Sequence, residues 1–112
     1  MEAAGLAAGV VVLTYSSTLA VNAAAGDTIR VTLGGNPTIS NPTGGIDGQV
    51  ITFELIQDGT GGRTVTWGSA YSFGSDVPQP TLTPTAGKRD FIGFKFNATT
   101  GLWYCVAVTR GN

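Results

Sequence analysis

The chain has 112 residues and a formal net charge of −1, with 42% apolar residues and only 12% charged residues. This length allows one domain with a single hydrophobic core, and the scattered, nearly balanced charges exclude strong attraction to nucleic acid. The charged share is about half of the ~25% usual for a soluble protein. Because such a surface does little to keep copies apart, it favours a protein that functions within an assembly.

The N-terminal segment is apolar from Ala3 to Leu13. No Lys or Arg precedes this run, whereas a secretory signal peptide begins with a positively charged region. The run is also shorter than the ~20 residues that a membrane-spanning helix needs. We therefore expect no transmembrane helix and no membrane partner. Residues 1–14 are interpreted as an N-terminal arm or first strand, followed by a β-sandwich domain over residues 15–112.

Short strands are expected along the whole chain, because Thr and Val are frequent between 17 Gly and 5 Pro residues. No stretch combines helical spacing of apolar residues with good helix formers, so little or no helix is predicted. The clearest strand is residues 49–57, where alternation places Ile51, Phe53 and Leu55 on one face. In chain order, the expected strands cover residues 9–14, 18–22, 27–33, 49–57, 63–67, 90–96 and 102–108.

Glycine-rich turns suggest how these strands pair. The sequence Asp-Gly-Thr-Gly-Gly at residues 58–62 favours the positive φ angles of a hairpin loop. It predicts that strand 49–57 pairs directly with strand 63–67. Residues 97–101 turn the chain between the last two strands, which predicts a second hairpin.

Proline residues mark two irregular stretches, one near Pro37 and Pro42 and one over residues 78–84. Since proline cannot donate to a central ladder, both stretches are predicted to be loops or edges. Residues 36–47 and 74–87 are therefore expected to be exposed. About seven or eight short strands at roughly ten-residue spacing predict an all-β fold, a single-domain antiparallel β-sandwich or barrel of jelly-roll-like form.

The sequence offers little for catalysis. It contains no histidine, which removes the Ser-His and Cys-His nucleophile arrangements. Cys105 alone cannot build a zinc site and is expected to be a buried thiol. An acid/base pair would have to join Glu54 to Asp58 or Asp90, while the alternative for Glu54 is an ion pair with a basic residue of another strand, Lys95 or Arg63. We predict that the chain is not an enzyme and has no catalytic, cofactor or metal site.

Aromatic side chains offer a candidate binding surface. A platform of aromatic rings packs well against the apolar faces of sugars. The alternative is that most of these rings fill the core or a subunit interface, because the chain is poor in Leu, Ile and Met. The candidates are Trp67, Tyr71, Phe73, Trp103 and Tyr104.

Two parts of the sequence carry a recurrent pattern. Residues 48–55 and 57–68 read as strand, glycine-rich turn and strand, ending at Trp67-Gly68. Residues 88–94 and Trp103 look like the closing hairpin of the same domain. Together they resemble a small β domain of tailed-bacteriophage virion proteins. Such domains occur as free-standing decoration proteins on capsids, often as trimers, and at the ends of minor tail and fibre proteins.

The resemblance implies two candidate functions. Because the chain opens with Met1 and shows no fibre shaft, we first expect a capsid decoration (cement) protein. It would be assembled in the host cytoplasm, lie on the capsid surface of the virion as a homotrimer, bind the major capsid protein and stabilise the shell. The alternative is a tail-fibre or minor-tail receptor-binding domain that recognises host-surface glycans.

The two functions would use different residues. In the first, the apolar arm adds a strand to a neighbouring copy or to a capsid subunit. In the second, surface aromatic rings contact the glycan. The contacts expected of the arm are Leu6, Val10, Val11, Val12 and Leu13, and the surface aromatics are Trp67, Tyr71 and Phe73.

Overall fold

The computed structural model of the chain describes residues 9–112 and contains nine strands and no helix in this part. Within the same residues, no helix is long and apolar enough to cross a membrane. The strands are β1 (Val10–Leu13), β2 (Thr18–Leu19), β3 (Thr28–Leu33), β4 (Thr38–Ile39), β5 (Val50–Gln57), β6 (Thr66–Trp67), β7 (Tyr71–Ser72), β8 (Arg89–Asn97) and β9 (Leu102–Thr109).

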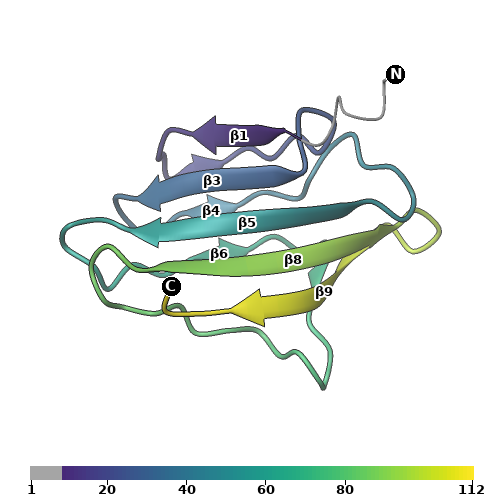
Figure 1. Cartoon of the computed structure of the whole chain (residues 1–112). Coiled ribbons are helices and arrows are strands. Elements are labelled where there is room, and N and C mark those ends of the chain that lie inside the picture. Colours follow the sequence, from purple (N-terminus) through teal and green to yellow (C-terminus); the bar gives the residue numbers. More distant parts are fainter. Residues whose placement is uncertain (1–8) are drawn as a thin grey trace.

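The strands form two sheets, which confirms the expected all-β, sandwich-like class. A six-stranded sheet has the order β1-β3-β5-β8-β9-β7, and a three-stranded sheet has the order β2-β4-β6. Figure 1 shows β3, β5, β8 and β9 side by side, with β4 and β6 in a second layer behind them. The core lies between these layers.

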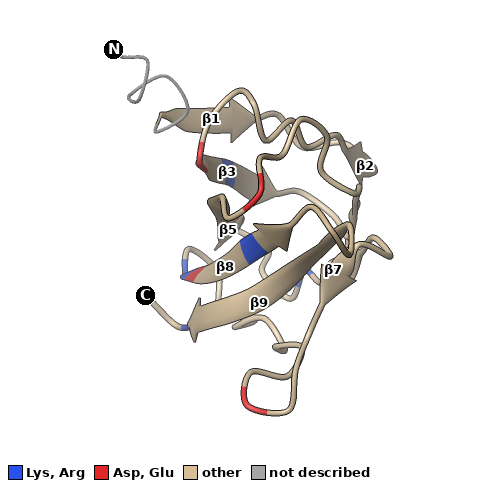
Figure 2. Cartoon of the chain, turned by 90° about the vertical axis from the view of Figure 1, so that its right-hand side faces the viewer, with Lys and Arg blue, Asp and Glu red and all other residues tan. Residues whose placement is uncertain are grey.

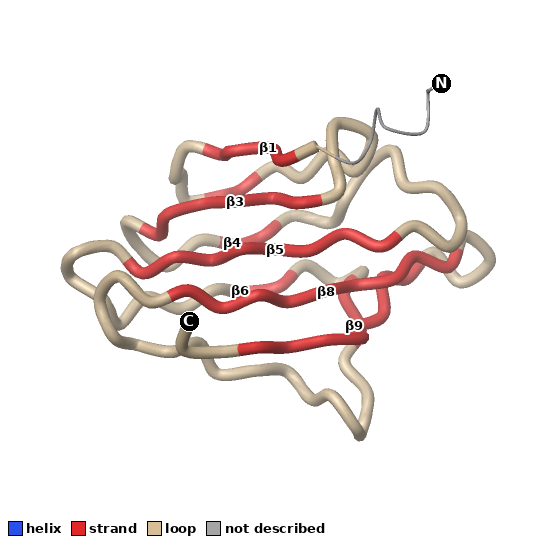
Figure 3. Tube along the Cα trace, viewed as in Figure 1, coloured by secondary structure: helices blue, strands red, loops and turns tan. Residues whose placement is uncertain are grey.

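The first six strands wind as a stack of parallel coils, and here the expectation of antiparallel pairing is wrong. The chain passes alternately between the two sheets, so β1, β3 and β5 pair in parallel, and β2, β4 and β6 do the same. In the first set, Val10 lies opposite Thr28, and Thr28 lies opposite Thr52. Each coil therefore consists of one strand in each sheet and the two crossings between them (Figure 3).

One predicted hairpin is confirmed and the other is wrong. Strands β8 and β9 pair antiparallel, with Asn97 opposite Leu102. Strand β5, however, pairs with β3 and β8, while β6 lies in the other sheet beside β4. The glycine-rich segment after β5 crosses between the sheets. Gly61 has a φ of +73°, and a Cβ atom there would lie 2.5 Å from the carbonyl oxygen of Pro84, so the close crossing requires glycine.

Strand β4 corrects the assignment of residues 36–47 to an exposed loop. Thr38 and Ile39 form the central strand of the smaller sheet, between β2 and β6. Pro37 and Ile39 are both fully buried. Proline is tolerated at this position because it precedes the first residue of the strand and does not interrupt the ladder.

The core follows the predicted alternation. Ile51, Phe53 and Leu55 of β5 are at most 2% exposed. Phe53 forms edge-to-face contacts with Tyr71 and Phe94, with each pair of ring centroids 5.8 Å apart. The remaining rings of this cluster are Trp67 and Phe73. The aromatic side chains thus supply much of the packing between the two sheets.

Candidate functional site

Glu54 occupies an ionic cluster and does not pair with another carboxylate. Its side chain is only 5% exposed and accepts hydrogen bonds from Arg30 Nε at 2.8 Å and from Arg89 Nη1 at 2.7 Å. Burial acts to raise the pKa of Glu54, but the two arginines outweigh it and hold the pKa below its ordinary value. The ion-pair alternative for Glu54 is therefore confirmed, although its partners are Arg30 and Arg89 and not Lys95 or Arg63.

The other two candidate carboxylates stabilise loops. Asp58 pairs with Arg63 at 3.0 Å and accepts hydrogen bonds from the backbone N–H groups of Thr60 and Gly61. The hydrogen bond from Arg63 is the main reason that the pKa of Asp58 is lowered. Asp90 is 2% exposed, and its two carboxylate oxygens accept hydrogen bonds from the backbone N–H groups of Thr83 and Gly111. Both side chains thus anchor turns of the chain.

Of the three aromatics predicted to lie on the surface, Tyr71 is in the core. It is 7% exposed, its hydroxyl donates to the carbonyl oxygen of Ser40, and burial raises the pKa of that hydroxyl. Trp67 and Phe73 are half-buried and pack against the same core. Tyr104, a member of the wider aromatic set, is 36% exposed. It is therefore the aromatic residue best placed to meet a ligand.

The predicted arm residues fall partly in β1. Val10 and Val12 face outward and are 49% and 68% exposed, while Leu13 packs against the core. Leu6 lies outside the residues that the structure describes. Strand β1 is at the edge of the six-stranded sheet, beside β3. Its outward side chains are therefore accessible to a partner.

The first coil carries no charge. No Asp, Glu, Lys or Arg occurs between Gly9 and Gly26, a range that includes both β1 and β2. Figure 2 shows both strands in tan, whereas β3 and β8 carry coloured segments. Proteins commonly protect exposed edges with charged residues. The two edges of this coil lack that protection.

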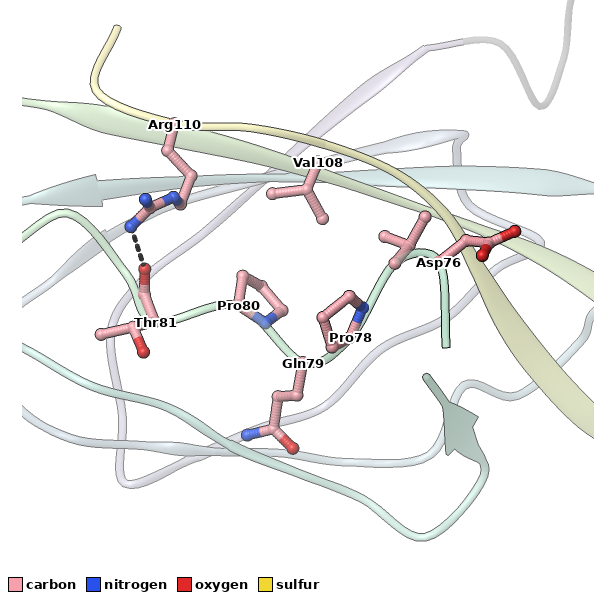
Figure 4. Close-up of a pocket in the computed structure, with 8 residues that line it drawn as sticks. Asp76, Pro78, Gln79, Pro80, Thr81, Val108 and Arg110 are labelled. Carbon is pink, nitrogen blue, oxygen red and sulfur yellow. Dashed lines mark hydrogen bonds between the residues drawn. The ribbon is translucent and has the colours of Figure 1, made fainter. Parts of the chain in front are cut away.

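A groove of about 420 Å³ lies beside the C-terminal end of β9. One wall is the segment 76–81, and the other is formed by Val108 and Arg110. Figure 4 shows Asp76 at one end and Arg110 at the other, where Arg110 Nη1 donates to the carbonyl oxygen of Thr81 at 2.7 Å. The segment cannot close onto β9 as a full strand, because Pro78 and Pro80 lack the N–H groups that a ladder requires.

The chemistry of this groove suits a polar ligand with apolar faces. Asp76 accepts hydrogen bonds and Arg110 donates them, while Val108 and the two prolines provide apolar surface between these ends. Sugars present hydroxyl groups at their edges and C–H groups on their faces. The groove therefore offers both polar groups and apolar surface to a ligand.

A second hollow, of about 250 Å³, lies on the outer side of the hairpin β8–β9. Tyr104 and Val106 supply its apolar surface, and Asp47, Lys95 and Asn97 supply polar groups. Asp47 accepts a hydrogen bond from the backbone N–H of Ala98. This bond holds the loop that contains Asp47 against the hairpin. An exposed ring beside polar side chains is a second surface suited to a sugar.

Sequence reasoning missed the groove residues, although it marked their loop. Residues 74–87 were expected to be exposed because of their prolines, and Asp76 and Gln79 are exposed there. The pairing of this loop with Arg110 spans about thirty positions of the chain. No local pattern signals such a contact.

The comparisons with known proteins identify a family for this chain. The family model described as "Putative phage tail fibre C-terminal domain" matches residues 12–88, more than half of the chain. The matched range begins within β1, includes β2 to β7 and the groove wall at residues 76–81, and ends before β8. No curated protein and no solved structure matches this chain. The chain therefore belongs to the phage tail fibre C-terminal domain family and is a structural protein of the phage virion.

Proposed function

We propose that this chain is a receptor-binding domain of a phage tail fibre and that it attaches the virion to host-surface glycans. The family match favours this tail-fibre alternative over capsid decoration. The observation that carries the glycan proposal is the groove beside β9, which has Asp76 and Arg110 at its ends and includes Val108, Pro78 and Pro80 in its walls. Binding requires no chemical step, and we propose that the domain is not an enzyme.

Removing the charged ends of the groove is expected to abolish most glycan binding. Asp76→Asn and Arg110→Gln each replace a charge-assisted hydrogen bond with a weaker neutral one, so affinity should fall about tenfold or more. The measurement is binding of the purified chain to an array of bacterial surface polysaccharides.

Gln79→Ala is the matched control, because Gln79 belongs to the same wall but its side chain points away from Val108 and Arg110 (Figure 4). Its binding should equal that of the wild type. Full binding by both charge variants would contradict the groove as the site. Loss of binding in Tyr104→Ala alone would move the site to the hollow on β8–β9.

The capsid decoration reading keeps one supporting feature, the uncharged first coil with outward Val10 and Val12. Such a surface suits contact with the major capsid protein or with other copies in a homotrimer. The molar ratio of this chain to the major capsid protein, measured in purified virions by quantitative mass spectrometry, separates the two functions. We expect a ratio far below one, as for a tail component, whereas a ratio near one would establish a shell protein.

A further inference from the structure

The outer face of the six-stranded sheet carries an unusual concentration of charge. Arg30 of β3 lies opposite Glu54 of β5, and Ile56 of β5 lies opposite Arg89 of β8. The carboxylate of Glu54 joins the two arginines, one at each oxygen. Three of the thirteen charged side chains of a charge-poor protein thus meet at one place on the sheet.

Within the part of the chain that the structure describes, each of the two arginines uses one guanidinium N–H group in a hydrogen bond. An arginine that serves only to neutralise a carboxylate commonly binds it with two parallel N–H bonds. Here Arg30 uses Nε and Arg89 uses Nη1, and within residues 9–112 no other side-chain hydrogen bond of either arginine is present. The two side chains are 42% and 41% exposed. Both arginine side chains are therefore partly accessible at the surface.

The cluster has an excess of positive charge, since two guanidinium groups meet one carboxylate. Two acidic side chains near it have other partners. Asp90 follows Arg89 in the chain but faces the interior at 2% exposure and is bound by backbone N–H groups. Asp58 is held by Arg63. Thr32, exposed on β3 opposite Ile56, adds a hydroxyl donor on the same face.

We propose that Arg30 and Arg89 form a binding site for a phosphate group, with Glu54 as the positioning residue that holds both guanidinium groups in place. Arginine forks match the geometry and charge of phosphate oxygens. Glu54 is buried beneath them and would not contact the phosphate. The site is separate from the groove beside β9 and does not depend on the glycan proposal. Its ligand is either free phosphate or a phosphate carried by a sugar.

The test is a titration of the purified full chain, followed by NMR or calorimetry, with inorganic phosphate, glucose 1-phosphate and uncharged glucose. We expect saturable binding of both phosphates, no binding of glucose at this site, and weaker phosphate binding as salt rises. Tighter binding of glucose 1-phosphate would identify a phosphorylated sugar as the ligand, and equal binding would identify the phosphate group alone.

Variants decide whether the arginines are responsible. Arg30→Gln and Arg89→Gln should each weaken phosphate binding about tenfold or more. Arg63→Gln is the matched control, because it also removes an arginine from a carboxylate pair but away from this cluster. Absence of saturable phosphate binding in the wild type, or an equal loss in Arg63→Gln, would overturn the proposal. Asp76→Asn should bind phosphate normally even if it loses polysaccharide.

Discussion

Replacing Phe53 with Ala is expected to cost about 3–5 kcal/mol of the free energy of unfolding. Phe53 is 1% exposed, and its ring meets the rings of Trp67, Tyr71 and Phe94 at centroid distances of 5.3 to 5.8 Å. The substitution removes both the buried apolar surface and the ring-to-ring contacts, and it leaves a cavity between the sheets. Urea denaturation followed by tryptophan fluorescence measures the effect.

Phe73→Ala is the matched control for this prediction. Phe73 contacts Trp67 and Phe94 at the rim of the same cluster but is half-buried. Water can fill the space that its ring leaves, so we expect a loss of about 1–2 kcal/mol. Equal losses for the two variants would show that the cluster is not organised around Phe53.

Glu54→Gln is expected to lower the free energy of unfolding by about 1–3 kcal/mol at pH 7, because a buried acceptor of two arginine hydrogen bonds loses its charge. The effect should depend on pH. The arginines hold the pKa of Glu54 in the folded chain below its ordinary value of 4.5. The stabilisation is therefore complete above about pH 4.5 and is lost as the pH falls through the lowered pKa.

Denaturation midpoints measured from pH 7 down to pH 2 test this linkage. The wild type should lose stability steeply in acid, whereas Glu54→Gln should lose less over the same range, so that the two curves converge. Asp58→Asn provides the comparison, since the pKa of Asp58 is also lowered, but this carboxylate pairs with one arginine and is more exposed than that of Glu54. Asp58→Asn should reduce the loss of stability in acid by less than Glu54→Gln does. Parallel curves for wild type and Glu54→Gln would contradict the linkage.

The strands of the larger sheet were predictable because their alternation is strong. The apolar positions of β5 and β8 read directly as one buried face, and both strands occur where the sequence places them. Strand β6 is shorter than the expected residues 63–67, because Gln57 binds the backbone of Arg63 and holds this part of the chain away from the ladder.

The coil winding was not predictable from local pattern. A glycine-rich turn that closes a hairpin and one that carries the chain to a second sheet contain the same residues, since both need positive φ angles. Strand β4 could not be predicted from the sequence for a related reason. Its two residues stand between Pro37 and Pro42, and their burial depends on β2 and β6, which lie far away in the sequence.

For the functional surfaces too, local pattern was predictable and contacts between distant residues were not. Sequence reasoning predicted that aromatic rings form a sugar-binding surface and that the loop at residues 74–87 is exposed. It placed Tyr71 on the surface, although burial of this ring is set by its contacts with Phe53 and Phe94. The ionic cluster of Glu54 was anticipated as an ion pair, but its partners depend on the parallel register of β3 with β5.

The parallel coils have a consequence for how this domain can change in length. Each coil contributes one rung to each sheet, and the two edges at β1 and β2 lie at the same end of the stack. A further coil placed before β1 would extend the domain by about 4.8 Å, the spacing between paired strands. The hairpin β8–β9 and the groove lie in the opposite half of the larger sheet, toward its other edge strand, β7. The reach of the domain and the chemistry of the groove can therefore vary independently.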